Sequence, residues 1–132
     1  MAQDLFGTGP RARLERAAEA LRTIHRILIA RTKSDYERTQ GPIRGPYALF
    51  TLLAQDPSFA WLQPMTRAIV ELEEVLGRKD PPVAPKDVEA ARRRLEELLS
   101  TPGAAFADRY LELLQSEPLL AAEHGRLKSV LA

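Results

Sequence analysis

The chain has 132 residues, no cysteine and a net charge of only +1. The absence of cysteine excludes disulfides and thiolate metal sites, and so small a net charge gives no indication of a nucleic-acid or membrane partner. No segment approaches the ~20 consecutive apolar residues that a membrane-spanning helix needs, and the N-terminal segment lacks the apolar core of a signal peptide. We therefore predict one domain over residues 1–132, loosely ordered over residues 1–9, that acts in the cytoplasm.

Apolar residues recur every three or four positions along nearly the whole chain, which predicts helices throughout and an all-α fold. The first helix is expected to begin at Pro10, where the missing N–H costs little, and to run to about Arg38. Gly41 and Pro42 then end it. Its inward stripe consists of Leu14, Ala17, Ala18, Leu21, Ile24, Leu28 and Thr32.

Residues 41–64 contain four prolines and two glycines in the sequence GPIRGPYALFTLLAQDPSFAWLQP. The same segment holds four of the chain's eight aromatic residues, which are one Trp, three Tyr and four Phe. Because proline and glycine interrupt helices, they predict a bent corner that contains a short helix over 47–55 and a turn over 57–62. A buried aromatic side chain removes about 150–250 Å² from water. We therefore expect the four aromatics to pack inward as the structural anchor of the corner: Tyr47, Phe50, Phe59 and Trp61.

Further helices are predicted from Pro64 to Gly77, from Pro85 onward, and over about 106–114 and 119–131. The Pro-rich segment 80–85 is too short for a domain boundary and is expected to be a stiff loop between packed helices. These elements give about four main helices and one or two short ones. Because the connections are short, we expect antiparallel neighbours in a helical bundle.

Two histidines, His25 and His124, fall on or beside apolar stripes. Two facing imidazoles could ligate a haem iron or, with carboxylates, a divalent metal, so a ligand-, haem- or metal-binding bundle is one alternative function. Di-iron bundles use Glu-x-x-His, but Arg22 and Ala121 stand three residues before the two histidines. We therefore predict no metal or other cofactor, and interpret both histidines as residues at the edge of the core.

A second candidate site lies at the end of the first helix, where Asp35 continues the inward register of the stripe. With Tyr36 and Arg44 it forms a candidate pocket for a small ligand. A buried carboxylate needs a cationic partner, and we expect Arg44 or Arg67 to supply it. The interpretation we favour is a structural ion pair that holds the corner in place.

Arginines on the first helix and in the run 92–94 raise a second alternative, a nucleic-acid-associated scaffold. Acidic residues lie among them, so solvated helix faces with i,i+4 ion pairs are the favoured interpretation. Catalysis is not expected, because we find neither a Gly-rich phosphate loop nor a serine with readable histidine and acid partners. The arginines concerned are Arg13, Arg16, Arg26, Arg92, Arg93 and Arg94.

The first and last helices carry more apolar residues than one inward stripe needs. A helix that is apolar on several sides is either central to the core or shared with a partner. The sequence therefore favours a small, non-catalytic protein–protein interaction or scaffold module that forms a two-fold homodimer. The predicted contact residues are Ile27, Ile29, Leu119, Leu120, Val130 and Leu131.

Overall fold

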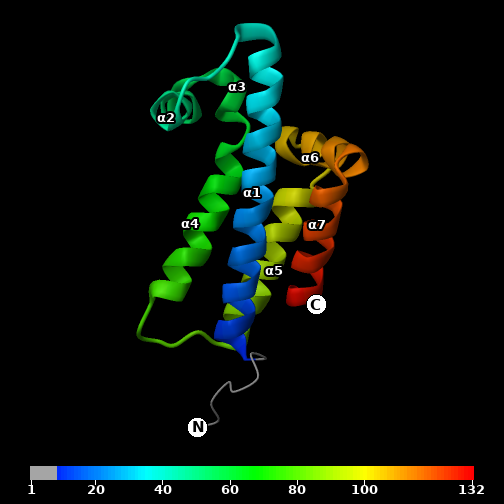
Figure 1. Ribbon diagram of the computed structural model, residues 1–132. Coiled ribbons are helices and arrows are strands. Elements are labelled where there is room, and N and C mark those ends of the chain that lie inside the picture. Colours follow the sequence, from blue (N-terminus) through cyan, green and yellow to red (C-terminus); the bar gives the residue numbers. More distant parts are fainter. Residues whose placement is uncertain (1–8) are drawn as a thin grey trace.

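The computed structural model describes residues 9–132, which form seven helices and, within that range, no strand (Figure 1). The predicted all-α fold is confirmed. The helices are α1 (Pro10–Gln40), α2 (Pro46–Gln55), α3 (Pro57–Ala60), α4 (Gln63–Gly77), α5 (Pro85–Ser100), α6 (Ala105–Ser116) and α7 (Pro118–Leu131). None of these helices combines the length and apolarity needed to cross a bilayer.

Helix α1 is the central helix of the bundle. Its 31 residues extend over roughly 46 Å at 1.5 Å per residue, and α4, α5 and α7 all pack against it. The predicted stripe from Leu14 to Thr32 is buried. Ala17, Ala18 and Ala20 have no exposed surface. Since successive residues turn by about 100° around a helix, these three alanines show that α1 is covered from several sides.

The corner between α1 and α4 follows its glycines and prolines. Gly41 has φ 88° and Gly45 has φ 90°, a left-handed region that residues with a Cβ avoid. Pro46 then lies in the first turn of α2. At the start of α3 the Asp56 carboxylate accepts a hydrogen bond of 2.8 Å from the backbone N–H of Ser58, and Pro64 lies in the first turn of α4, where a proline is tolerated.

The loop that joins α4 to α5 is held by one arginine. Arg78 donates to the carbonyl oxygen of Pro81 at 2.8 Å and to Asp87 Oδ2 at 2.8 Å. The same Asp87 oxygen accepts the backbone N–H of Ala84 at 2.8 Å. These bonds to the backbone and to Arg78 lower the pKa of Asp87. The loop therefore connects α4 and α5 through a fixed turn.

Candidate functional site

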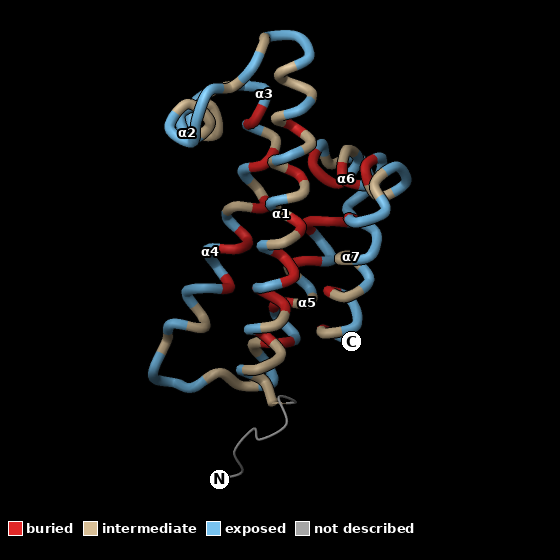
Figure 2. The backbone as a smooth tube through the Cα atoms, in the orientation of Figure 1, coloured by how far each residue is buried: buried red, intermediate tan, exposed pale blue. Residues whose placement is uncertain are grey.

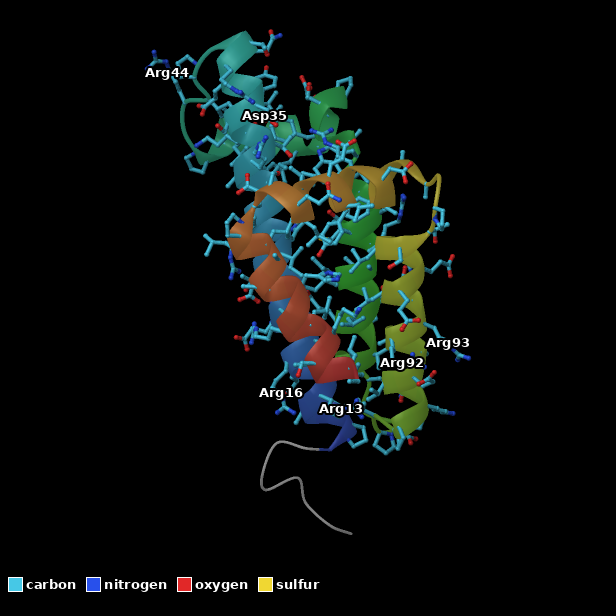
Figure 3. All side chains as sticks on the ribbon, turned by 90° about the vertical axis from the view of Figure 1, so that its right-hand side faces the viewer. Arg13, Arg16, Asp35, Arg44, Arg92 and Arg93 are labelled. Carbon is cyan, nitrogen blue, oxygen red and sulfur yellow. The ribbon has the colours of Figure 1, made fainter. Side chains whose placement is uncertain are left out.

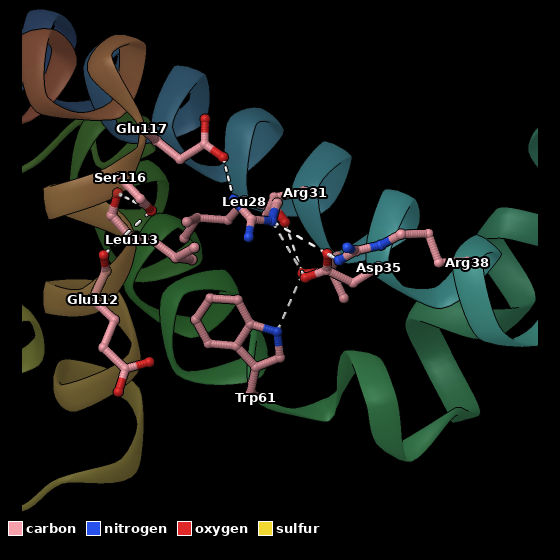
Figure 4. Close-up of polar contacts among 10 residues, drawn as sticks. Leu28, Arg31, Asp35, Arg38, Trp61, Glu112, Leu113, Ser116 and Glu117 are labelled. Carbon is pink, nitrogen blue, oxygen red and sulfur yellow. Dashed lines mark hydrogen bonds and ion pairs between the residues drawn. The ribbon is translucent and has the colours of Figure 1, made fainter.

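Two of the four corner aromatics belong to the core. Phe59 is completely buried and lies 5.7 Å from Tyr36, measured between ring centroids. Trp61 stacks on Phe106 at 5.4 Å, and its Nε1–H donates to Thr32 Oγ1 at 3.2 Å (Figure 4). The indole therefore joins the corner to α1 and α6 at once.

The expectation of inward packing is wrong for the other two aromatics. Tyr47 is 84% exposed and Phe50 is 69% exposed. Both lie on α2, which contains no buried residue and extends away from the bundle (Figures 1 and 2). The physical reason is the backbone path: the turns at Gly41 and Gly45 direct α2 outward, and among the other helices α3 is its main contact.

The exposed side of α2 is one continuous, uncharged surface. Tyr47, Phe50, Thr51 and Ala54 are exposed and recur at three- to four-residue spacing, so they share one side of the helix. We call these four residues the α2 face. The other side, Leu49, Leu52 and Leu53, packs half-buried against the core. No residue from 45 to 55 carries a charge.

The ion pairs of Asp35 differ from the expected ones. Asp35 pairs with Arg31 and Arg38 on its own helix (Figure 4). Arg44 is exposed beyond the end of α1 and makes no ion pair among the described residues (Figure 3). Two arginines at i−4 and i+3 reach the carboxylate without leaving the helix, so no cation from the corner is required. The prediction of Arg44 or Arg67 as partner is wrong.

Arg31 also connects distant parts of the chain. Besides Asp35 it pairs with Glu117, which lies between α6 and α7 (Figure 4). The hydrogen bonds to Glu117 and Asp35 raise the pKa of Arg31. This chain of charges runs along the surface beside Trp61 and stabilises the packing of the last two helices on α1. The charged residues at the end of α1 therefore make their ion pairs within the protein, where they stabilise the fold.

The two histidines have different partners on different helices. His25 Nε2 lies 3.2 Å from Thr66 Oγ1 on α4, and burial lowers the pKa of His25. His124 Nδ1 lies 2.9 Å from the hydroxyl of Tyr110 on α6. Burial lowers the pKa of His124, and the positive charge of Lys128 lowers it further. Within residues 9–132 no group of three or more potential ligand side chains could hold a metal ion.

Helices α5 and α7 border a groove of about 440 Å³. Both helices pack against α1 and α6 but make little contact with each other, which leaves a space between them. From α5 the lining residues are Arg92, Leu95, Glu96, Leu99 and Ser100. From α7 they are His124, Leu127, Lys128, Leu131 and Ala132. The sequence alone did not indicate this groove, because it depends on how far apart two non-consecutive helices lie.

Several of the arginines considered for nucleic-acid contact are engaged within the chain. Arg13 donates to the carbonyl oxygens of Val130 and Ala132 at 3.1 and 2.7 Å. Arg92 pairs with Glu89 and Glu96, and Arg94 pairs with Glu71 at 2.9 Å. Figure 3 shows Arg13 and Arg16 on α1, and Arg92 and Arg93 on α5. The cations are therefore distributed over the bundle and interleaved with carboxylates.

The predicted contact residues on α1 and α7 lie mostly against the core. Leu120 has no exposed surface and Leu131 is 5% exposed, so the prediction that a partner contacts them is wrong. The wide apolar side of α7 is used inside the chain, because α7 packs on both α1 and α6. Ile27, Ile29 and Val130 are half-buried against the same core. Leu119 alone of the six is fully open, at 73% exposure.

Comparison with known proteins identifies no relative: no family model, no curated protein and no solved structure matches this chain. Among the described residues, the α2 face and the groove between α5 and α7 are two surfaces open to recognition.

Proposed function

We propose that this chain is a small, non-catalytic interaction module that self-associates through the α2 face. The observation that carries the proposal is the exposure of Tyr47 and Phe50 on a helix without charges. Single exposed apolar residues are ordinary, but adjacent large apolar residues on one helix side mark an interaction site. Tyrosine and phenylalanine are also enriched at the centre of protein–protein interfaces. The absence of cysteine supports a cytoplasmic location as part of the same proposal.

A second copy of the chain is the partner that fits this surface. In a two-fold contact each side chain near the axis meets its own equivalent, so a charge there would face a like charge. The α2 face has no charge to oppose the contact. Phe50 is midway between Arg44, which precedes α2, and Asp56, which follows it.

This spacing gives an antiparallel pair of α2 helices complementary ends. With Phe50 near the two-fold axis, Arg44 of each copy lies opposite Asp56 of the other. Opposite charges at the ends of the pair then fix its register, as charged pairs do at other interfaces. Asp56 still accepts the N–H of Ser58, which leaves its second carboxylate oxygen free for the arginine.

The size of the α2 face predicts a weak dimer. A standard stable interface buries about 800 Å² on each partner, whereas two aromatic side chains of about 150–250 Å² each provide at most about 500 Å². We therefore expect a reversible equilibrium with a dissociation constant in the micromolar range or weaker. Such an equilibrium is suited to a module that assembles according to its concentration.

The test is sedimentation velocity over concentrations from roughly micromolar to millimolar, with circular dichroism to follow folding. Phe50→Ser should shift the equilibrium to monomer, while the melting temperature stays unchanged because the Phe50 side chain is 69% exposed. Val70→Ser is the matched control: Val70 is 49% exposed on α4 and should leave association unaffected.

Arg44→Glu examines the register of the pair. It should weaken association by placing like charges opposite each other, and it should do so most at low ionic strength. A wild-type chain that stays monomeric throughout the concentration range overturns the proposal. If Phe50→Ser leaves the dimer intact, the interface does not lie on α2, and the proposal is equally overturned.

A further inference from the structure

The groove between α5 and α7 has the composition of a small-molecule site, and it involves neither α2 nor the contact proposed above. Its floor is formed by four leucines, two from each helix: Leu95, Leu99, Leu127 and Leu131. Its volume of about 440 Å³ lies within the range of about 300–1,000 Å³ that small-molecule sites occupy. An apolar floor with a few polar groups around it is the usual design of such sites.

The polar wall begins with His124, whose tautomer is fixed by Tyr110. The hydroxyl of Tyr110 is completely buried and has one hydrogen-bond partner among the described residues, Nδ1 of His124 at 2.9 Å. If Nδ1 carried a proton, the hydroxyl oxygen would accept a hydrogen bond from Nδ1–H. The hydroxyl hydrogen of Tyr110 would then have no acceptor, which is costly in a buried site. Tyr110 therefore donates to Nδ1, and the proton of the neutral ring lies on Nε2.

Nε2–H of His124 is consequently a hydrogen-bond donor without a partner in the part of the chain that the structure describes. One turn further along α7, Lys128 also lines the groove and makes no ion pair within residues 9–132. The other charges that line the groove lie on α5 and are satisfied: Arg92 pairs with Glu96 at 3.0 Å and also with Glu89. The groove thus has an open cation and an open N–H donor on the α7 side.

We propose that this groove binds a small amphipathic carboxylate. The apolar part of the ligand lies on the four leucines, and the carboxylate accepts from Nε2–H of His124 and from the ammonium of Lys128. Charge complementarity selects the anion, because Lys128 is the cation of the wall without a carboxylate of its own. A charge-assisted hydrogen bond is roughly twice as strong as a neutral one, so the head group should contribute strongly to affinity.

The probe for the test is decanoate below its critical micelle concentration, with binding followed by calorimetry and by NMR chemical shifts. Decanol has the same chain without the charge, and decyltrimethylammonium has the opposite charge. We expect saturable 1:1 binding of decanoate that shifts the signals of His124 and Lys128. Decanol should bind about tenfold more weakly, and the cation should not bind measurably.

Three variants locate the site. Lys128→Gln should weaken decanoate binding about tenfold, whereas Arg93→Gln, which removes an exposed cation on α5, should leave it unchanged. Phe50→Ser should also leave it unchanged, since the α2 face lies on another part of the molecule (Figure 1).

Three results would overturn the proposal. The first is absence of saturable decanoate binding. The second is equal binding of decanoate and decanol, which would remove the role of the charge. The third is loss of binding in Phe50→Ser, which would place the ligand on α2. None of these results bears on self-association, which is measured without ligand.

Discussion

The bond between Tyr110 and His124 shows how one buried hydroxyl sets the protonation of a neighbouring ring. Tyr110 belongs to an aromatic series that runs from Trp61 through Phe106, with centroids 5.4 and 5.9 Å apart, and ends on His124 at 5.6 Å. Burial raises the pKa of Tyr110, so its hydroxyl keeps its proton at any ordinary pH. A hydroxyl that donates to Nδ1 favours the neutral form of the imidazole.

Tyr110→Phe is therefore expected to raise the pKa of His124. The substitution removes the hydrogen bond that stabilises the neutral ring, while the burial that also lowers this pKa stays in place. The loss of one hydrogen bond should also reduce the free energy of unfolding by about 1 kcal/mol. An NMR titration of the His124 ring protons measures the pKa directly. An unchanged or lower value would show that the hydroxyl does not donate to Nδ1.

Residue roles were predictable only where a local pattern determined them. Phe59, expected to pack inward at the corner, is buried, and Asp56, which stands directly before Pro57, caps α3 as its local sequence favours. The partners of Asp35 were mistaken, because several arginines lie within reach of one carboxylate and the side-chain geometry decides between them. The pairing of Tyr110 with His124 depends on two helices meeting at a particular angle, which spacing within either helix does not reveal.

At the scale of elements, the close packing of α1 against its neighbouring helices requires small residues at the points of contact. Ala18→Leu adds a branched side chain where there is no exposed surface. Overpacking of this kind should lower the free energy of unfolding by about 1–3 kcal/mol. Ala30→Leu is the matched control, since Ala30 is exposed on the same helix and should change stability by less than about 0.5 kcal/mol. Urea unfolding checks both; equal effects would contradict close packing at Ala18.

Helix boundaries were the most predictable feature of this chain. Proline lies in the first turn of α1, α2, α3, α4, α5 and α7, and this placement marks helix starts in the sequence itself. The orientation of α2 was not predictable in the same way. A short helix that is apolar on both sides can bury only one of them, and the backbone turns at Gly41 and Gly45 determine which.

At the scale of the whole molecule, the contacts of Trp61 with α1 and α6 join the two halves of the chain. Arg31 and Glu117 make a second connection between α1 and the start of α7. The single domain predicted for residues 1–132 should accordingly unfold in one cooperative step. Trp61 is the only tryptophan, so its fluorescence reports on this junction alone, whereas far-UV circular dichroism reports on all the helices. Coincident urea transitions are expected; a fluorescence change at lower urea would indicate two units.

The way in which α2 is attached has a consequence for how the chain tolerates change over evolution. The α2 face, whose four residues are exposed, places little restraint on its own composition, provided that Gly41 and Gly45 keep their turns. Substitutions on this face would alter the contact that we propose for it and leave the melting behaviour of the fold intact. The same scaffold could thus acquire, exchange or lose a binding partner in single mutational steps, without passing through an unfolded ancestor.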